Sequence, residues 1–111
     1  MMRYVLALDF GASSGRAMLA GFDGSRITLQ EVHRFANEPV SKDGRLYWNV
    51  PQLMEELEQG LQVGYAIAPY ESIAIDTWGV DYGMLGADGT LLELPRHYRD
   101  GRTDGILQKA E

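Results

Sequence analysis

One segment combines residues that could take part in catalysis, namely a carboxylate, a turn of small residues and a guanidinium. It runs from Asp9 through Gly11-Ala12-Ser13-Ser14-Gly15 to Arg16. Backbone N–H groups in such a turn can converge on an anion, and glycine lets a phosphate approach the backbone closely. Asp9 would then hold Mg²⁺ through its water shell, because this ion keeps several waters and takes only one or two carboxylates. The combination indicates phosphoryl transfer, and an ordinary hairpin with serines in its turn is the alternative.

Two common phosphate loops are excluded for this turn. The chain contains neither G-x-x-x-x-G-K-[ST] nor G-x-G-x-x-G, and the turn is expected to lead into a strand rather than a helix. A nucleotide bound here would therefore need a different nucleotide-binding fold.

A second segment places two acids, a tryptophan and a glycine at the end of a predicted strand. Ligands of open α/β sheets lie beyond the carboxyl ends of strands, so Asp76 could face the same crevice as Asp9. Trp78 would supply an apolar wall, Gly79 a close backbone approach, and Asp81 an acceptor for hydroxyl groups. The alternative is a buried tryptophan at a β-bulge, followed by a solvated Asp81.

A third segment is a dense polar cluster near the end of the chain. Arg99, Asp100 and Arg102 could form an ion-pair network that shapes a pocket or binds a polar ligand, or else a surface network of weak pairs. The two histidines, His33 and His97, have no metal-ligand spacing and no nucleophile partner. We expect both to be structural or solvated rather than catalytic.

A meander of strands is expected to position the first segment. Alternating residues predict strands over 3–9, 16–22 and 26–35, with a two-residue hairpin turn at Asp23-Gly24. The alternation of the third strand slips between Leu29 and Val32, which indicates a bulge or an early end.

A hairpin, a helix and a fourth strand should follow. The hairpin spans 37–49 and turns at Asp43-Gly44. The helix would be capped by Asn49, carry Pro51 in its first turn and end near Ala68-Pro69. Its apolar face would consist of Leu53, Met54, Leu57, Leu61 and Gly64.

The strand after this helix, over 72–77, should lie parallel to the sheet, because a strand that follows a crossover helix usually does. Two further strands are expected over 80–86 and 90–94, joined at Asp88-Gly89, and Thr103 could cap a last helix. Since that helix has barely begun at Glu111, we expect the chain to be truncated.

The composition is that of one ordinary globular domain at most. Of the 111 residues, 45% are hydrophobic and 23% charged, and the formal net charge is −6. The acidic balance argues against nucleic-acid partners, because phosphate contacts need clustered Lys and Arg. No run approaches the about 18 apolar residues of a membrane span, and no signal-peptide core is present. The lack of cysteine excludes disulfides and fits a reducing compartment, so we expect a soluble cytoplasmic protein.

In their order along the chain, these segments resemble the amino-terminal part of the FGGY carbohydrate kinases. Asp9, Gly11 and Arg16 match the opening motif D-x-G-x-x-x-x-R, and further matches lie at 48–50, 75–81 and 98–103. The resemblance implies an α/β fold of the ribonuclease-H-like, actin-like ATPase type, with a mixed sheet, three antiparallel strands and a crossover helix. Residues 1–111 would be the amino-terminal part of the first domain, without the rest of that domain or the second domain.

The resemblance also implies an activity and a role for each candidate residue. A kinase of this family would transfer the γ-phosphoryl group of ATP, with Mg²⁺ as cofactor, to a small sugar, here the 1-hydroxyl of L-rhamnulose. Asp9 would organise the metal and the phosphates, and Gly79, with Trp78 and Asp81, would contact the sugar. ATP would be bound by the turn and the residue after it, namely Gly11, Ala12, Ser13, Ser14, Gly15 and Arg16.

The catalytic base of such kinases comes from later sequence than this chain contains. We therefore expect the 111 residues alone to be inactive. The incomplete sheet should also expose apolar surface and associate with other copies or with the remaining portion.

Three other functions stay open at this point. The kinase could act on another ketose or polyol, such as L-fuculose or D-xylulose. The same fold could be a nuclease in which Asp9 and Asp76 begin a two-metal site. It could also be a non-catalytic module that senses a sugar or a nucleotide.

Overall fold

The structure is a computed structural model, and it describes residues 1–106. The chain forms two compact units, of which the first consists of residues 1–37 and 51–78. The second unit consists of residues 38–50 and of the chain from residue 79 onward. No helix within residues 1–106 has the length and apolar character that crossing a bilayer requires.

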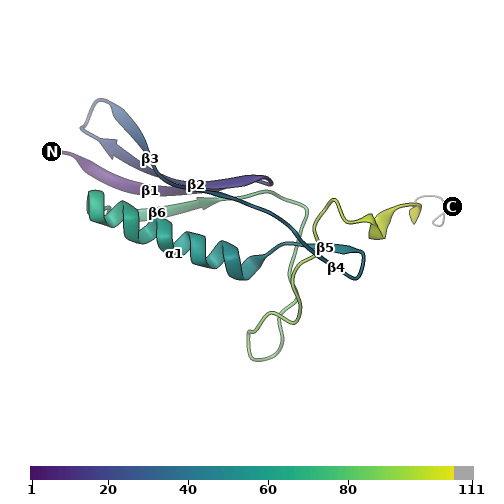
Figure 1. Cartoon of the computed structure of the whole chain (residues 1–111). Coiled ribbons are helices and arrows are strands. Elements are labelled where there is room, and N and C mark those ends of the chain that lie inside the picture. The colour runs from purple at the N-terminus through teal and green to yellow at the C-terminus, as the bar shows by residue number, and fades with distance from the viewer. Residues whose placement is uncertain (107–111) are drawn as a thin grey trace. The chain divides into compact units, whose positions relative to one another are not determined.

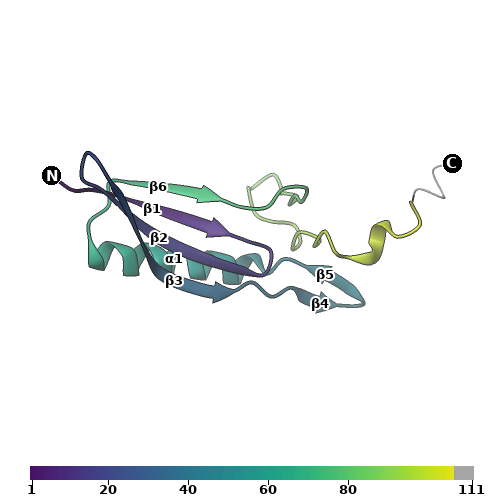
Figure 2. The same cartoon turned by 90° about the horizontal axis from the view of Figure 1, so that it is seen from above.

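A four-stranded mixed sheet forms one layer of the first unit (Figures 1 and 2). Its order is β3-β2-β1-β6, in which β1, β2 and β3 are antiparallel and β6 is parallel to β1. The predicted meander, crossover and parallel fourth strand are therefore confirmed. The strands are β1 (Arg3–Phe10), β2 (Ser14–Phe22), β3 (Ile27–Ala36) and β6 (Ser72–Asp76).

Helix α1 (Val50–Ile67) forms the other layer and packs along one face of this sheet (Figure 1). Two buried glycines bring it close to the strands. A Cβ at Gly64 would lie 2.8 Å from Leu6 Cδ1, and one at Gly60 would lie 3.0 Å from Ala17 Cβ. The apolar face was predicted correctly except for Met54, which is 51% exposed. The shared core consists of Leu6, Leu8, Phe10, Ala17, Leu19, Phe35, Leu53 and Ala68.

The predicted irregularity in the third strand is a bulge in β3. Ala17 pairs with His33 and Met18 with Glu31, so Val32 is the additional residue on this strand. A bulge shifts the side-chain alternation by one position, which is the slip visible in the sequence.

The turn between β2 and β3 is longer than predicted. Phe22 pairs with Ile27, which leaves a loop of residues 23–26 rather than a two-residue turn. Asp23 explains the difference, because its Oδ1 accepts hydrogen bonds from the backbone N–H groups of Ser25 (2.8 Å) and Arg26 (2.7 Å). These bonds lower the pKa of Asp23 and close the loop in a wider geometry.

The second unit contains the predicted hairpin, made of β4 (Val40–Lys42) and β5 (Arg45–Tyr47). Its turn residues Asp43 and Gly44 have φ values of 52° and 74°, the left-handed conformation that a two-residue hairpin turn needs.

The two strands predicted over 80–86 and 90–94 are wrong. In this segment the structure has a single isolated bridge between Leu85 and Leu91 and no strand. Within residues 1–106, Met84 and Leu92 stay more than half exposed, so burial adds little to this ribbon, and an isolated two-stranded ribbon is marginally stable at best.

A short 3-10 helix, η1 (Gly101–Thr103), begins after Asp100, whose carboxylate caps it by accepting from the Arg102 N–H. The helix predicted to start near Thr103 falls largely on residues 107–111, which lie outside the described residues.

Candidate functional site

The carboxyl ends of β1 and β6 bring two aspartates side by side. Asp9 pairs in register with Asp76 on β6 and with Arg16 on β2. Side chains of in-register neighbours project from the same face of a sheet, so the three form one row. Leu8 and Phe10 belong to the core beside α1, and strand alternation therefore directs Asp9 to the opposite face.

Asp9 is available to solvent on this face. Its Oδ2 lies 3.3 Å from Arg16 Nε, and both side chains are 47% exposed. An exposed pair of this kind contributes little to stability, about 0–1 kcal/mol. The carboxylate and the guanidinium can therefore change partners at a modest energetic cost.

The predicted phosphate turn connects β1 to β2. The Gly11 N–H donates to the Ser14 carbonyl (2.9 Å), so Ala12 and Ser13 form the tip. Ser13 and Ser14 are exposed. No residue within 1–106 accepts a backbone hydrogen bond from the Ala12 or Ser13 amide. This turn therefore offers amide and hydroxyl donors to an anion.

Gly15 has a packing role within this turn. It is buried on β2, and a Cβ there would lie 2.2 Å from Phe35 Cζ on the neighbouring strand. Only glycine lets the Phe35 ring close over the strand at this point.

Asn37 is a residue of this site that the sequence reasoning missed. Its backbone N–H donates to the Ser13 carbonyl (3.0 Å) and its Nδ2 donates to the Gly11 carbonyl (2.9 Å). The sequence offered no signal for these contacts, because 26 positions separate Asn37 from Gly11.

The aspartate pair fits a magnesium ion better than a metal with a full protein cage. Within residues 1–106 no group of three or more His, Asp or Glu side chains is placed to hold a metal. Mg²⁺ is commonly bound through one or two carboxylates and keeps its waters. Asp9, with Asp76 beside it, supplies that donor set.

The residues predicted to contact the sugar are divided between the two units. Trp78 is the last residue of the first unit, and it is partly buried against the core. Gly79 and Asp81 belong to the second unit. Val80 between them has a φ of 67°, a left-handed conformation that is strained for a β-branched residue and is often found at functional turns.

Asp81 is half-buried and held by an aromatic side chain, so the alternative of a solvated Asp81 is wrong. The Trp48 indole Nε1–H donates to Asp81 Oδ2 at 2.6 Å, and Trp48 is 1% exposed. The indole stacks on His97, with ring centroids 3.9 Å apart and an angle of 22° between the planes. A carboxylate has acceptor capacity beyond one bond, so Asp81 can accept a ligand hydroxyl in a defined orientation.

His97 supports this cluster in its neutral form. Burial, together with the Arg99 charge, lowers the pKa of His97. Its Nδ1 accepts from the Arg99 N–H at 3.0 Å, which leaves the ring proton on Nε2. The structural role predicted for His97 agrees with these contacts.

Asp100 is the centre of the polar cluster near the end of the described chain. It is 4% exposed, and hydrogen bonds from the N–H groups of Leu46 (2.7 Å) and Arg102 (3.1 Å) lower its pKa, the Leu46 bond most. The guanidinium groups nearest to its carboxylate, at 3.8 and 3.9 Å, are those of Arg45 and Arg96. The predicted ion-pair network of Asp100 with the side chains of Arg99 and Arg102 is therefore wrong. The Arg99 guanidinium lies over the Tyr98 ring instead.

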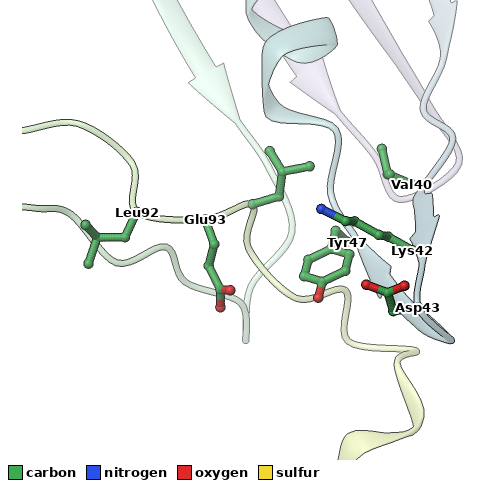
Figure 3. Close-up of a pocket in the computed structure, with 7 residues that line it drawn as sticks. Val40, Lys42, Asp43, Tyr47, Leu92 and Glu93 are labelled. Carbon is green, nitrogen blue, oxygen red and sulfur yellow. The ribbon is translucent and has the colours of Figure 1, made fainter.

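The second unit also contains a cavity of about 360 Å³ that none of the predicted site residues lines. In Figure 3, Lys42 and Tyr47 of the β4–β5 hairpin lie on one side, and Leu92 and Glu93 lie on the other. The remaining lining residues are Val40, Asp43 and Leu94.

Comparisons with known proteins agree with the predicted family. No protein-family model matches the chain. A rhamnulokinase of Klebsiella pneumoniae subsp. pneumoniae is 47% identical over 116 positions, which cover 99% of this chain and 23% of that protein. A rhamnulokinase of Mannheimia succiniciproducens is 43% identical over 110 positions, which cover 96% of this chain and 23% of that protein.

The fold is shared with a solved carbohydrate kinase. The structure of a xylulose kinase from Rhodospirillum rubrum matches with a TM-score of 0.74 and 19% identity, over 98% of this chain and 24% of that one. The predicted α/β fold of the actin-like ATPase type is therefore confirmed. The chain spans about a quarter of the length of the relatives that it matches, and over nearly all of its own length it is homologous to the amino-terminal part of the rhamnulokinases of the FGGY carbohydrate kinase family.

Proposed function

We propose that this chain is the amino-terminal part of an ATP-dependent sugar kinase that phosphorylates the 1-hydroxyl of L-rhamnulose. The observation that carries the proposal is the identity of 43–47% to rhamnulokinases over 96–99% of the chain. The products would be L-rhamnulose 1-phosphate and ADP.

The β1–β2 turn and Arg16 would hold the phosphates of ATP. Phosphoryl transfer depends mainly on positioning and on neutralising charge, and this turn combines amide donors at Ala12 and Ser13 with exposed serine hydroxyls. The half-exposed Arg16 guanidinium can release Asp9 and contact a phosphate oxygen instead.

Asp9, with Asp76 beside it, would hold Mg²⁺ through water molecules. When bound, this ion neutralises charge on the phosphate oxygens during transfer. Asp9 would then change its partner when nucleotide binds. Without nucleotide its carboxylate would orient Arg16, and with nucleotide it would orient the metal.

The sugar would be contacted by Gly79, Trp78 and Asp81. Asp81 is supported in this role by the Trp48 indole, which orients its carboxylate, and Gly79 has open space where a side chain would be. The base that takes the proton from the sugar hydroxyl is assigned to no residue of this chain. We therefore propose that the 111 residues do not phosphorylate sugar by themselves.

The test is a coupled ADP-release assay on the complete gene product with Mg²⁺ and ATP. L-rhamnulose is compared with L-fuculose, D-xylulose and glycerol, and the highest kcat/KM is expected for L-rhamnulose. A higher kcat/KM for one of the other compounds would support the assignment as a kinase but show that its substrate is not L-rhamnulose. No turnover of any sugar would favour a non-catalytic sensing module.

A further inference from the structure

Asn37 connects the end of β3 to two carbonyls of the phosphate turn, those of Gly11 and Ser13. It is 3% exposed. Its side-chain Nδ2 donates to the Gly11 carbonyl at 2.9 Å, and its backbone N–H donates to the Ser13 carbonyl at 3.0 Å. The turn is therefore attached to the sheet by a residue that is distant in sequence.

The side-chain bond decides where one amide of the turn points. The chain has no cis peptide bonds among its described residues, and the C=O and N–H of a planar trans peptide point in opposite directions. Because Asn37 holds the Gly11 carbonyl on the β3 side, the Ala12 N–H points away from β3. That amide is one of the donors assigned to the phosphates above.

The side-chain amide of Asn37 makes one contribution that is unfavourable for folding. Its Oδ1 is buried and has no hydrogen-bond partner among residues 1–106. A buried acceptor without a partner is unfavourable by about 1–3 kcal/mol, and an apolar side chain of the same outline would avoid this. The donor function of Nδ2 is the feature that an apolar replacement would lose.

We propose that Asn37 is a positioning residue for phosphate binding, because its side chain fixes the orientation of the Ala12 amide toward the anion. The inference rests on the proposed kinase function. It adds to that function a residue that touches neither ATP nor the sugar and acts through the backbone of the turn.

The experiment is a calorimetric titration of the complete gene product with MgATP, which gives the Kd, with far-UV circular dichroism as the check that each variant is folded. The test variant is Asn37→Leu, which keeps the branched outline but has no donor and no charge. Loss of one oriented hydrogen bond should raise the Kd for MgATP by about tenfold, while the circular dichroism spectrum and the KM for the sugar stay those of the wild type.

The matched control is Tyr70→Phe, which deletes another side-chain bond to a backbone carbonyl in the same unit, from Tyr70 Oη to Leu61 (3.0 Å). Its Kd for MgATP should equal that of the wild type. Equal Kd values for Asn37→Leu and Tyr70→Phe would overturn the inference. If the wild type does not bind MgATP at all, the proposed kinase function is wrong instead. Asn37→Ala, which also has no side-chain donor, replaces Asn37→Leu if the latter fails to fold.

Discussion

The charge of Asp9 is expected to matter for turnover and hardly at all for the stability of the fold. Its contact with Arg16 is exposed, so removing the charge should change the free energy of unfolding by less than about 1 kcal/mol. The same charge is assigned to the metal and the phosphates. We expect Asp9→Asn in the complete gene product to lower kcat by about 100-fold or more, as measured by ADP release, with an almost unchanged melting temperature.

Glu31→Gln is the control for this prediction. Glu31 also pairs with an arginine on the same sheet, since its Oε1 lies 2.6 Å from Arg34 Nε, and it too is partly exposed. This variant should retain wild-type kcat. A similar loss of turnover in both variants would mean that Asp9 acts only through the general charge of the sheet.

His97 should make the second unit sensitive to mild acid. Its pKa is lowered in the folded protein, chiefly by burial, so the unfolded chain binds a proton more readily than the folded one. Stability from this group is therefore present above the ordinary value of 6.5 and is lost as the pH falls through and below it. The near-UV circular dichroism of the Trp48 stack should report this loss during thermal unfolding at several pH values.

His97→Phe keeps an aromatic ring against Trp48 but cannot titrate. Its melting temperature should depend less on pH than that of the wild type in this range. An unchanged pH dependence would show that another group is responsible.

At the scale of elements, glycines determine how closely the layers and strands approach. A Cβ at Gly15 would overlap the Phe35 ring, whereas one at Gly79 would meet no atom within 4 Å. We expect Gly15→Ala to lower the free energy of unfolding by about 1–3 kcal/mol, because overpacking forces the ring to move.

Gly79→Ala serves as the comparison and should change stability by no more than about 0.5 kcal/mol. Urea denaturation of the two variants measures the difference. If Gly15→Ala is as stable as Gly79→Ala, the Phe35 ring does not pack on Gly15 as closely as described.

At the scale of the whole molecule, the sheet of the first unit ends at β6 within the described residues. Ile73 and Ile75 on this strand are 49% and 56% exposed, and exposed edge strands with apolar side chains promote association. We expect the 111-residue chain to self-associate in sedimentation experiments and Ile75→Lys to reduce the association.

Val80→Lys controls for the added charge, because Val80 is 88% exposed but lies outside the sheet. It should leave the association unchanged. A wild-type chain that is monomeric over the concentration range would exclude β6 as an association edge.

Most of the first unit was predictable because its signals are local. The alternation of β1 and β2, the small residues of the turn, the bulge in β3 and the apolar face of α1 all depend on neighbours within one element. The two strands over 80–86 and 90–94 were predicted wrongly for the same reason. Their alternation and the Asp88-Gly89 turn are local signals, but within residues 1–106 Met84 and Leu92 stay more than half exposed, so burial does not stabilise strands there.

Residue type and spacing alone predict the order of the elements in the first unit and in the β4–β5 hairpin, the phosphate-turn motif and the resemblance to carbohydrate kinases. Only the tertiary structure decided that Asn37 holds the turn, that Trp48 orients Asp81, and that Asp100 pairs with Arg45 and Arg96. Most of these contacts join residues that are distant in sequence, by 26 positions for Asn37 and Gly11 and by 33 for Trp48 and Asp81. Such contacts follow from strand register and chain crossing, and no periodicity along the sequence encodes them.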